Sequence, residues 1–246
     1  MKKEDLLKYV EGKGYSLTEE VRNAAEELAE ILEAEGETDI AHVLAWLEEK
    51  RANLSAKVTP IPIKELDKWK TDPETGNISH DSGRFFSVIG VKIEGATESP
   101  QQNWTQPIVW QEECGILGVL RQRKGGVMRY LLWAKFEPGS IANPQLSPTV
   151  QATASNLAQV HGGAKPRFAE YFENGGKGTT VVSVVHVEDP SRFYRKTNRC
   201  VVVEVPEEEE IEITDSFIWL TLPQIKKLLR VDLAVNALAR DVFGSL

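Results

Sequence analysis

Short β-rich runs separated by turn residues dominate the chain from residue 84 to residue 205. They lie at Arg84–Ile93, Pro107–Gln111, Ile116–Gln122, Val127–Lys135, Thr180–Val187 and Cys200–Val205. Runs of this length and composition are typical of strands. Two later segments, Leu222–Arg230 and Leu233–Phe243, have helical periodicity, and we expect Thr221 and Asp232 to cap them. The sequence therefore predicts an α+β fold, with a curled or mixed sheet and helices gathered late in the chain.

The first 55 residues differ from the rest, because they are acidic and have the periodicity of helices. Apolar residues recur at helical spacing, first at Val21, Ala24, Ala25, Leu28, Ile31 and Leu32, then at Ile40, Val43, Leu44 and Leu47. Ser16 and Glu19 have the spacing of a capping box before the first stripe. We predict a helical hairpin over residues 1–55 and a separate body over residues 56–246. Two short helices are not stable alone, so the hairpin should dock on the body or on another subunit.

Charge and cysteine content exclude several classes of protein. The net charge is −8, and residues 1–55, with seven Lys/Arg and fourteen Asp/Glu, carry −7 of it. This balance argues against general nucleic-acid binding, although a nearly neutral body can still hold a local basic pocket. Two cysteines are too few for a disulfide framework or a cysteine-based zinc site. With no signal peptide and no membrane span visible, we expect a soluble, cytoplasmic protein.

A series of unusual polar strings runs through the body in a fixed order. The three densest strings are, in chain order, Glu137-Pro138-Gly139, Ser147-Pro148-Thr149-Val150-Gln151-Ala152-Thr153 and His161-Gly162-Gly163. Flanking strings include Trp104-Thr105-Gln106-Pro107, Ser191-Arg192-Phe193, Asn198-Arg199 and Val235-Asn236-Ala237-Leu238-Ala239-Arg240. This ordered set resembles one module of the NDP-hexose 2,3-dehydratases, and the likeness covers nearly everything after the N-terminal hairpin.

The resemblance implies a Nudix-like fold and an enzyme that acts on a nucleotide-diphosphate sugar. Members of the family remove water across C2 and C3 of an NDP-4-keto-6-deoxyhexose, commonly the dTDP sugar, in deoxysugar biosynthesis. The C4 ketone acidifies the hydrogen on C3, so a base can remove it, and the C2 hydroxyl can then leave with acid assistance. This chemistry demands no redox or metal cofactor. Family members carry two related modules in tandem, so we expect a homodimer to replace the pair here.

Three residues are candidates for the acid–base chemistry. Glu137 follows an apolar strand and precedes a Pro-Gly turn, so it can be a catalytic carboxylate, as acid or base, or simply fix that turn. His161 can transfer protons near neutral pH, or it can be a turn histidine. Tyr171, with Tyr130 as an alternative, can protonate the leaving hydroxyl or hold the C4 oxyanion, although buried tyrosines usually serve packing.

Candidate substrate-binding residues surround these three. On a strand, Thr149, Gln151 and Thr153 would share one polar face suited to sugar hydroxyls, close to Asn156 and Gly162. Arginine binds phosphate oxygens in pairs, so Arg192 and Arg199 are candidates for the diphosphate, with Lys135 and Arg240 as further choices. Trp104 or Trp110 can stack on the base, and Gln106 and Asn198 lie in matching strings; the alternative for each is a core or surface role.

One departure from the family pattern favours a rival hypothesis. Before Arg192-Phe193 the family pattern has a Ser-Glu-Gln or Ser-Glu-Glu run, whereas this chain has Val187-Glu188-Asp189-Pro190. Together with the single module, this difference allows a catalytically silent nucleotide-sugar-binding or assembly protein. A further alternative is pairing with a different half-length subunit.

Overall fold

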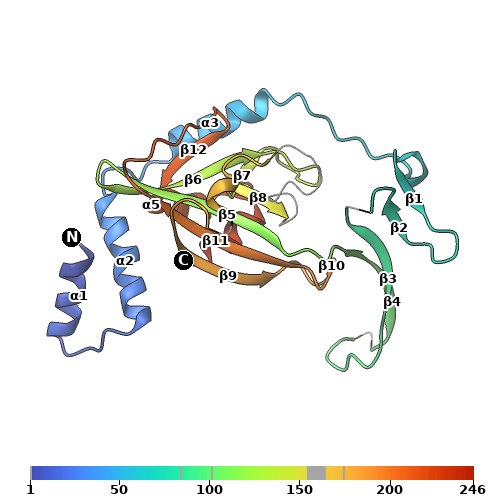
Figure 1. The fold of residues 1–246 in the computed structure, drawn as a ribbon, viewed down its shortest axis with the longest axis horizontal. Coiled ribbons are helices and arrows are strands. Elements are labelled where there is room, and N and C mark those ends of the chain that lie inside the picture. The colour runs from blue at the N-terminus through green and yellow to red at the C-terminus, as the bar shows by residue number, and fades with distance from the viewer. Residues whose placement is uncertain (1, 84, 101, 154–164, 174) are drawn as a thin grey trace.

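The computed structural model describes residues 2–83, 85–100, 102–153, 165–173 and 175–246 (Figure 1). Within these residues the chain forms N-terminal helices, a mixed sheet with helices against it, and a second sheet that projects to one side. The predicted α+β class, with a mixed sheet flanked by helices, is therefore confirmed. No helix in the described part of the chain is long and apolar enough to cross a membrane.

The mixed sheet, here called the body sheet, has seven strands. Five follow the order β12-β6-β5-β11-β9, while β7 pairs with β6 and β8 pairs with β5. Only β5 and β11 run parallel among the described pairs of this sheet. The strands are β5 (Gly115–Lys124), β6 (Val127–Lys135), β7 (Gln145–Ser147), β8 (Val150–Thr153), β9 (Thr179–Val187), β11 (Thr197–Val205) and β12 (Phe217–Thr221).

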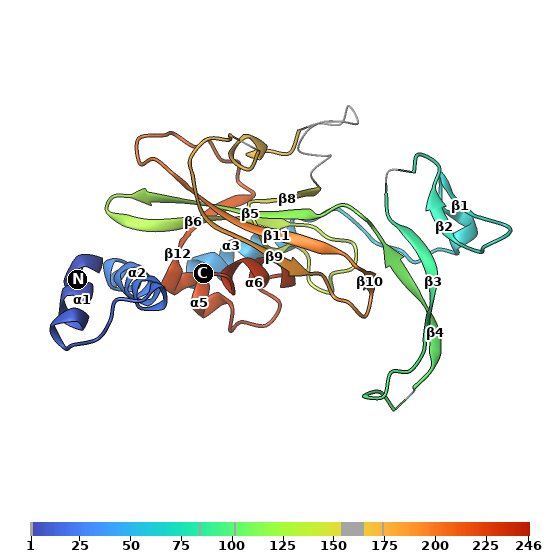
Figure 2. The same cartoon turned by 60° about the horizontal axis from the view of Figure 1, so that its bottom comes forward.

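The body sheet buries both faces, which explains the apolar runs of its central strands β5 and β11. One face packs against three helices, α3 (Ala41–Ala52), α5 (Leu222–Leu228) and α6 (Ala237–Phe243), shown beneath the sheet in Figure 2. The other face is covered by a smaller cluster that includes Phe168, Tyr171 and Phe217, near the 3₁₀ turn Ala169–Tyr171.

The second sheet, here called the arm sheet, has the order β1-β2-β3-β4-β10. It projects away from the body in both Figure 1 and Figure 2. Its strands are β1 (Trp69–Thr71), β2 (Ile78–His80), β3 (Ser87–Ile93), β4 (Trp104–Trp110) and β10 (Phe193–Tyr194), and a 3₁₀ turn at Ile63–Glu65 precedes them. The short strand β10 joins the arm sheet to the body, because it pairs with β4 just before the chain enters β11.

The N-terminal segment holds three helices: α1 (Lys3–Gly12), which the periodicity did not predict, α2 (Glu19–Glu33) and α3. Thr18 caps α2 by accepting a bond from the Val21 amide at 3.4 Å, so the predicted Ser16 capping box is wrong. Val43 and Leu47 of α3 are buried in the main core. The expected docking on the body is confirmed for α3.

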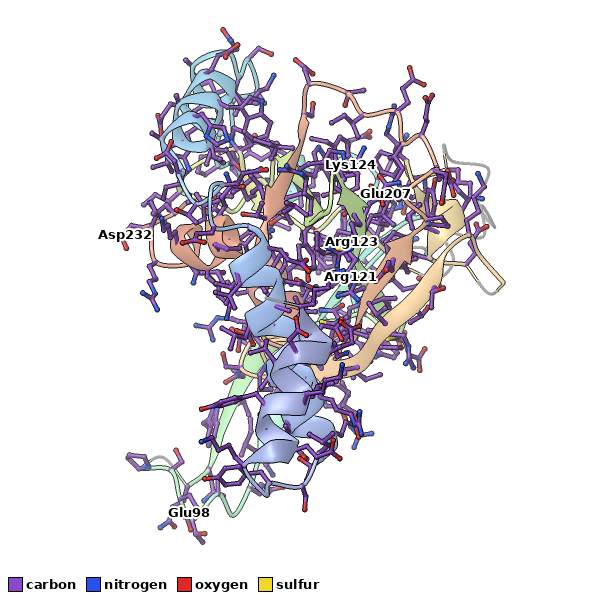
Figure 3. All side chains as sticks on the ribbon, turned by 90° about the vertical axis from the view of Figure 1, so that its left-hand side faces the viewer. Glu98, Arg121, Arg123, Lys124, Glu207 and Asp232 are labelled. Atoms are coloured by element: carbon purple, nitrogen blue, oxygen red, sulfur yellow. The ribbon has the colours of Figure 1, made fainter. Side chains whose placement is uncertain are left out.

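A row of ion pairs binds α2 and the residues after it to the body sheet. Glu26 and Glu30 face Arg121, Glu33 pairs with Arg123, and Glu37 pairs with Arg129. Figure 3 shows Arg121 and Arg123 beside the N-terminal helices. The acidic character of the first 55 residues thus has a structural use, since carboxylates one helical turn apart meet arginines that alternate along β5 and β6.

The C-terminal helices begin where their caps dictate. Thr221 caps α5, as predicted, and the structure adds a reciprocal capping box with Gln224. The predicted cap Asp232 is wrong: α6 begins at Ala237, and Asn236 caps it by accepting a bond from the Ala239 amide at 2.8 Å. The correct cap places the start of α6 beside the ends of the body strands β8 and β11, where residues 236–238 line a pocket.

Candidate active site

A pocket of about 490 Å³ opens at one end of the body sheet. Its floor is made by the starts of β5 and β11 and by β8, and its walls come from β10, the turn after β6 and the start of α6. Apolar side chains such as Ile116, Phe193 and Leu238 line part of it. The polar side chains in the lining are those of Gln111, Glu137, Gln151, Thr153, Glu188, Lys196, Asn198 and Asn236.

Glu137 is held in the pocket by two neighbouring strands. Its Oε1 accepts bonds from Lys135 Nζ and from Gln151 Nε2, each at 3.0 Å. Asn143 fixes the backbone, because its Oδ1 accepts from the Glu137 amide at 3.0 Å and its Nδ2 donates to the Glu137 carbonyl at 2.7 Å. The side chain that fixes the turn after β6 is therefore that of Asn143 and not that of Glu137. The carboxylate of Glu137 lines the pocket instead.

Gln151 has an unused acceptor in the same wall. Its Nε2 donates to Glu137, while its Oε1 is buried and has no hydrogen-bond partner among the described residues. A buried carbonyl oxygen without a donor costs free energy, so a rotation of the Gln151 amide that brings this oxygen to a ligand hydroxyl would relieve that cost. Gln151 is thus suited to bind a sugar hydroxyl next to Glu137.

Lys196 is the cation of this pocket within the described part of the chain. Its side chain is buried, and its Nζ donates to the carbonyl of Glu113. No carboxylate forms an ion pair with it among the described residues, and burial lowers the pKa of its ammonium group. A buried ammonium group of this kind can stabilise an anion on a bound ligand.

Glu188 supplies a second carboxylate, oriented by Asn198. Asn198 Nδ2 donates to Glu188 Oε2, and both residues line the pocket. Gly115 makes this contact possible, because a Cβ at position 115 would lie 2.1 Å from Asn198 Oδ1. The run that differs from the family pattern at Val187–Pro190 therefore contributes a site residue.

The sequence missed Lys196, Glu188 and Asn236, although strand alternation indicates one of them. Residues 196 and 198 project to the same side of β11 and its extension, whereas residue 199 projects to the other. Given Asn198 as a site residue, the same alternation places Lys196 in the site and excludes Arg199. Arg199 was predicted because arginine is a preferred phosphate ligand, although the strand alternation places Lys196, and not Arg199, on the side of Asn198.

The structure brings together five of the predicted site residues. Glu137, Gln151, Thr153 and Asn198 line the pocket, and Lys135 binds Glu137 at its rim. Asn156, His161 and Gly162 lie outside the described residues, so their predicted roles are not addressed by the structure.

Six of the predicted site residues lie away from this pocket, and two of them, Thr149 and Tyr171, are buried. Thr149 is buried, where its hydroxyl accepts from the Leu120 amide at 3.0 Å and donates to the Leu131 carbonyl. It therefore cross-links β5 and β6 and does not share the polar face of Gln151. Tyr171 lies in the core on the opposite face of the body sheet, where it donates to Glu209 at 2.6 Å.

The remaining candidates make structural contacts. Trp104 donates to Gln106 at 2.9 Å on β4, and Gln106 donates to the Ser191 carbonyl at 3.1 Å, so this pair ties β4 to the loop before β10. Arg192 is exposed and contacts Ser191, and Arg199 is exposed and donates to Ser183 at 3.1 Å. The alternatives Tyr130 and Arg240 bind Glu30 and the Leu229 carbonyl, respectively, and Trp110 is exposed on β4.

Comparison with known proteins identifies the family. Residues 40–246 match the sequence pattern of the NDP-hexose 2,3-dehydratases. The chain belongs to this family. The match begins at residue 40 and so includes α3, whose side chains contribute to the main core. The proposed boundary between residues 55 and 56 remains a prediction.

Relatives in this family are similar over most of the chain. A dTDP-4-dehydro-6-deoxy-α-D-glucopyranose 2,3-dehydratase from Saccharopolyspora spinosa is 45% identical over 202 residues, which is 81% of this chain and 40% of the relative. Enzymes of the same name from Amycolatopsis orientalis and Streptomyces violaceoruber are 40% and 42% identical over 83% and 85% of this chain. Those matches cover 44% and 47% of the relatives. The chain thus spans less than half the length of these relatives.

Solved structures with a similar arrangement include Nudix proteins. The crystal structure of an ADP compounds hydrolase has a TM-score of 0.42 and 14% identity, covering 65% of this chain and 84% of that one. A Nudix hydrolase from M. smegmatis has a TM-score of 0.35 and 15% identity, covering 63% of this chain and 96% of that one.

Proposed function

We propose that this chain is a nucleotide-sugar lyase. It removes water across C2 and C3 of an NDP-4-keto-6-deoxyhexose, with dTDP as the expected nucleotide, and yields a 3,4-diketo-2,6-dideoxy sugar in deoxysugar biosynthesis. The observation that carries the proposal is the pocket that joins the carboxylate of Glu137 to the buried ammonium group of Lys196. Family membership supports the same reaction.

In the proposed first step, Glu137 removes the hydrogen on C3. The electrons of the C3–H bond form the C3=C4 double bond of an enolate, and negative charge moves to the C4 oxygen. Glu137 suits this role, because Lys135 and Asn143 fix its position while its carboxylate faces the pocket. An anion at C4 requires a positive or donating group close by.

In the second step the enolate electrons form the C2=C3 double bond, the C4 ketone returns, and the C2 hydroxyl leaves as water after accepting a proton. The product is an enol at C3 that tautomerises to the 3,4-diketone. Lys196 is the residue suited to stabilise the C4 oxygen, and Gln151 and Asn198 are suited to bind sugar hydroxyls. His161 stays a predicted proton-transfer residue, and we propose it here as the donor to the leaving hydroxyl.

Incubation of the chain with dTDP-4-keto-6-deoxyglucose tests the proposal. Mass spectrometry should detect a product that has lost one water molecule. Glu137→Gln should bind the nucleotide sugar and lose turnover at least 100-fold, because a neutral amide cannot take the C3 proton. Arg199→Gln is the matched control, since it changes an exposed residue outside the pocket and should leave turnover intact.

The same experiment distinguishes the rival function. A folded parent chain that binds the nucleotide sugar but releases no water would instead support the catalytically silent binding protein. Equal turnover in Glu137→Gln and the parent would exclude Glu137 as the base.

We infer further that the working unit is a homodimer in the cytoplasm. The dimer is proposed because the family resemblance implies two related modules that act as a pair, and a second copy of this chain would supply the second module. The cytoplasmic location is supported by the two cysteines, Cys114 and Cys200, which are both free, as a reducing compartment favours.

A further inference from the structure

Arg51, in the last turn of α3, binds two segments of the body at once. Its Nε donates to the Pro144 carbonyl at 3.3 Å, and its Nη2 donates to the Leu233 carbonyl at 2.7 Å. Its Nη1 donates to Glu48 Oε1 of the same helix at 2.6 Å, which fixes the direction of the side chain. Because the guanidinium group is planar and rigid, the first two bonds set the separation between the two carbonyls.

The first of these segments is the turn that follows β6 and carries Glu137. Asn143, directly before Pro144, accepts from the Glu137 amide and donates to the Glu137 carbonyl. Ser140 of the same turn donates to Gln145 Oε1 at 2.9 Å, so the turn is also bonded to the residue after Pro144. A shift of the Pro144 carbonyl would therefore move Asn143 and, through it, the backbone of Glu137.

The second segment runs from Leu233 into the start of α6. Leu233 has a φ of +58°, in a region that residues other than glycine rarely adopt. Its carbonyl accepts from Gln145 Nε2 at 3.0 Å as well as from Arg51, and these two donors support that conformation. The amide of Asn236 donates to the Leu146 carbonyl at 2.9 Å, and Asn236 then lines the pocket. Arg51 thus holds the outer end of a segment whose inner end is a pocket wall.

We propose that Arg51 is a positioning residue for the dehydration, because it holds the turn of Glu137 at a fixed separation from the start of α6. Glu137 and Asn236 line the pocket, whereas Arg51 is not among the described residues that line it. Arg51 therefore acts through the two segments and not on the ligand. A base misplaced by about 1 Å can lose about 100-fold in rate. The inference rests on the proposed lyase activity, with Glu137 as its base.

Lys50, the neighbour of Arg51 on α3, supplies a matched control. Its Nζ pairs with Asp215 at 2.7 Å, in the loop before β12, and neither of these residues lines the pocket. The Lys50 side chain is 19% exposed and that of Arg51 is 22% exposed. The two cations therefore share a helix and a degree of burial, and differ in the segments that they bind.

The first test compares Arg51→Met with Lys50→Met in the full chain, with dTDP-4-keto-6-deoxyglucose as the substrate. Arg51→Met should lower kcat at least about 10-fold and leave KM within about threefold of the parent value. Deuterium at C3 should slow this variant more than it slows the parent, because proton removal becomes the slower step. Lys50→Met should keep the parental kcat and isotope effect. Arg51→Lys retains the charge but not the planar fork, so its kcat should stay low, and a parental kcat in this variant would overturn the proposal.

Amide hydrogen exchange, followed by NMR, supplies a readout that does not depend on turnover. In Arg51→Met the amides of Glu137 and Asn236, both hydrogen-bonded in the parent, should exchange at least about 10-fold faster, while amides of Thr197–Val205 stay protected. Unchanged exchange at both amides would overturn the proposal. Faster exchange with a parental kcat, or a lower kcat without a larger isotope effect, would reduce Arg51 to a structural role. A parent chain without turnover would refute the lyase activity, and exchange at Glu137 and Asn236 would then decide whether Arg51 fixes the pocket.

Discussion

Substitution of Gly115 by alanine tests whether the pocket at the end of the body sheet is the active site. A Cβ at this position would lie 2.1 Å from Asn198 Oδ1 and 3.2 Å from Asn198 Cγ, so the amide must move. Gly115 does not have a positive φ, so the effect comes from crowding and not from backbone strain. The displaced amide loses its bond to the carboxylate of Glu188.

The expected size of the effect follows from that lost contact. A hydrogen bond to a charged group contributes about 1.5–3 kcal/mol. If the contact orients the site, kcat/KM for dehydration of the 4-keto sugar should fall about 10-fold to 150-fold, since about 1.4 kcal/mol corresponds to a factor of ten. Crowding should lower the free energy of unfolding by about 1–3 kcal/mol, which urea denaturation can measure.

Gly139→Ala is the matched control for this prediction. Gly139 lies two residues from Glu137, and a Cβ there would meet nothing within 4 Å. Its kcat/KM should stay within about twofold of the parent value, as for an ordinary surface substitution. A folded Gly115→Ala variant with parental kcat/KM would refute the assignment of Asn198 and Glu188 to the active site.

Three further predictions concern charge and hydrogen bonding. Arg121→Met should reduce the free energy of unfolding by about 3–5 kcal/mol, because it leaves the buried carboxylate of Glu30 without the guanidinium group that pairs with it. In urea denaturation, the double variant Arg121→Met/Glu30→Gln should recover part of this loss. A double variant no more stable than Arg121→Met would contradict the reasoning. We propose that the ammonium form of Lys196 stabilises the C4 oxygen, and burial lowers the pKa of this group. The value of kcat/KM should therefore fall as the pH rises through that lowered pKa. Lys196→Arg should move this fall to higher pH, and an unchanged profile would exclude Lys196 as the titrating group. Tyr171→Phe should lower the free energy of unfolding by about 1.5–3 kcal/mol, because it removes the hydrogen bond to Glu209. Its kcat/KM should stay within about twofold of the parent value. A large loss of turnover would instead support a catalytic role for Tyr171.

Local sequence patterns predicted most of the elements of the body. The runs at Val127–Lys135 and Thr180–Val187 correspond to β6 and β9, because β-branched residues favour strands wherever the strand is later placed. Thr221 was recognisable as a cap from its own neighbours. Asp232 is a wrong choice, since four residues separate it from the start of α6, and the backbone of Ala234 and Asn236 bonds to Leu146 instead of forming helix.

The site was predicted less completely than the fold. Ordered motifs identified Glu137, Gln151 and Asn198, which β6, β8 and β11 bring into one pocket. The same motifs also included Thr149, whose hydroxyl serves the backbone of two core strands. A residue type and its position in a motif indicate what a side chain can do, but not which face of the sheet it occupies.

By itself, the sequence determined the α+β class, the acidic helical N-terminus and the family, because each of these depends on neighbouring residues and on the order of motifs. Tertiary structure alone decided that α2 pairs its carboxylates with Arg121 and Arg123, that Lys196 and Glu137 line the same pocket, and that the arm sheet projects from the body. These features depend on pairings between segments far apart in the chain, such as β5 with β11. Such pairings are selected by the burial of the whole core and not by local preference.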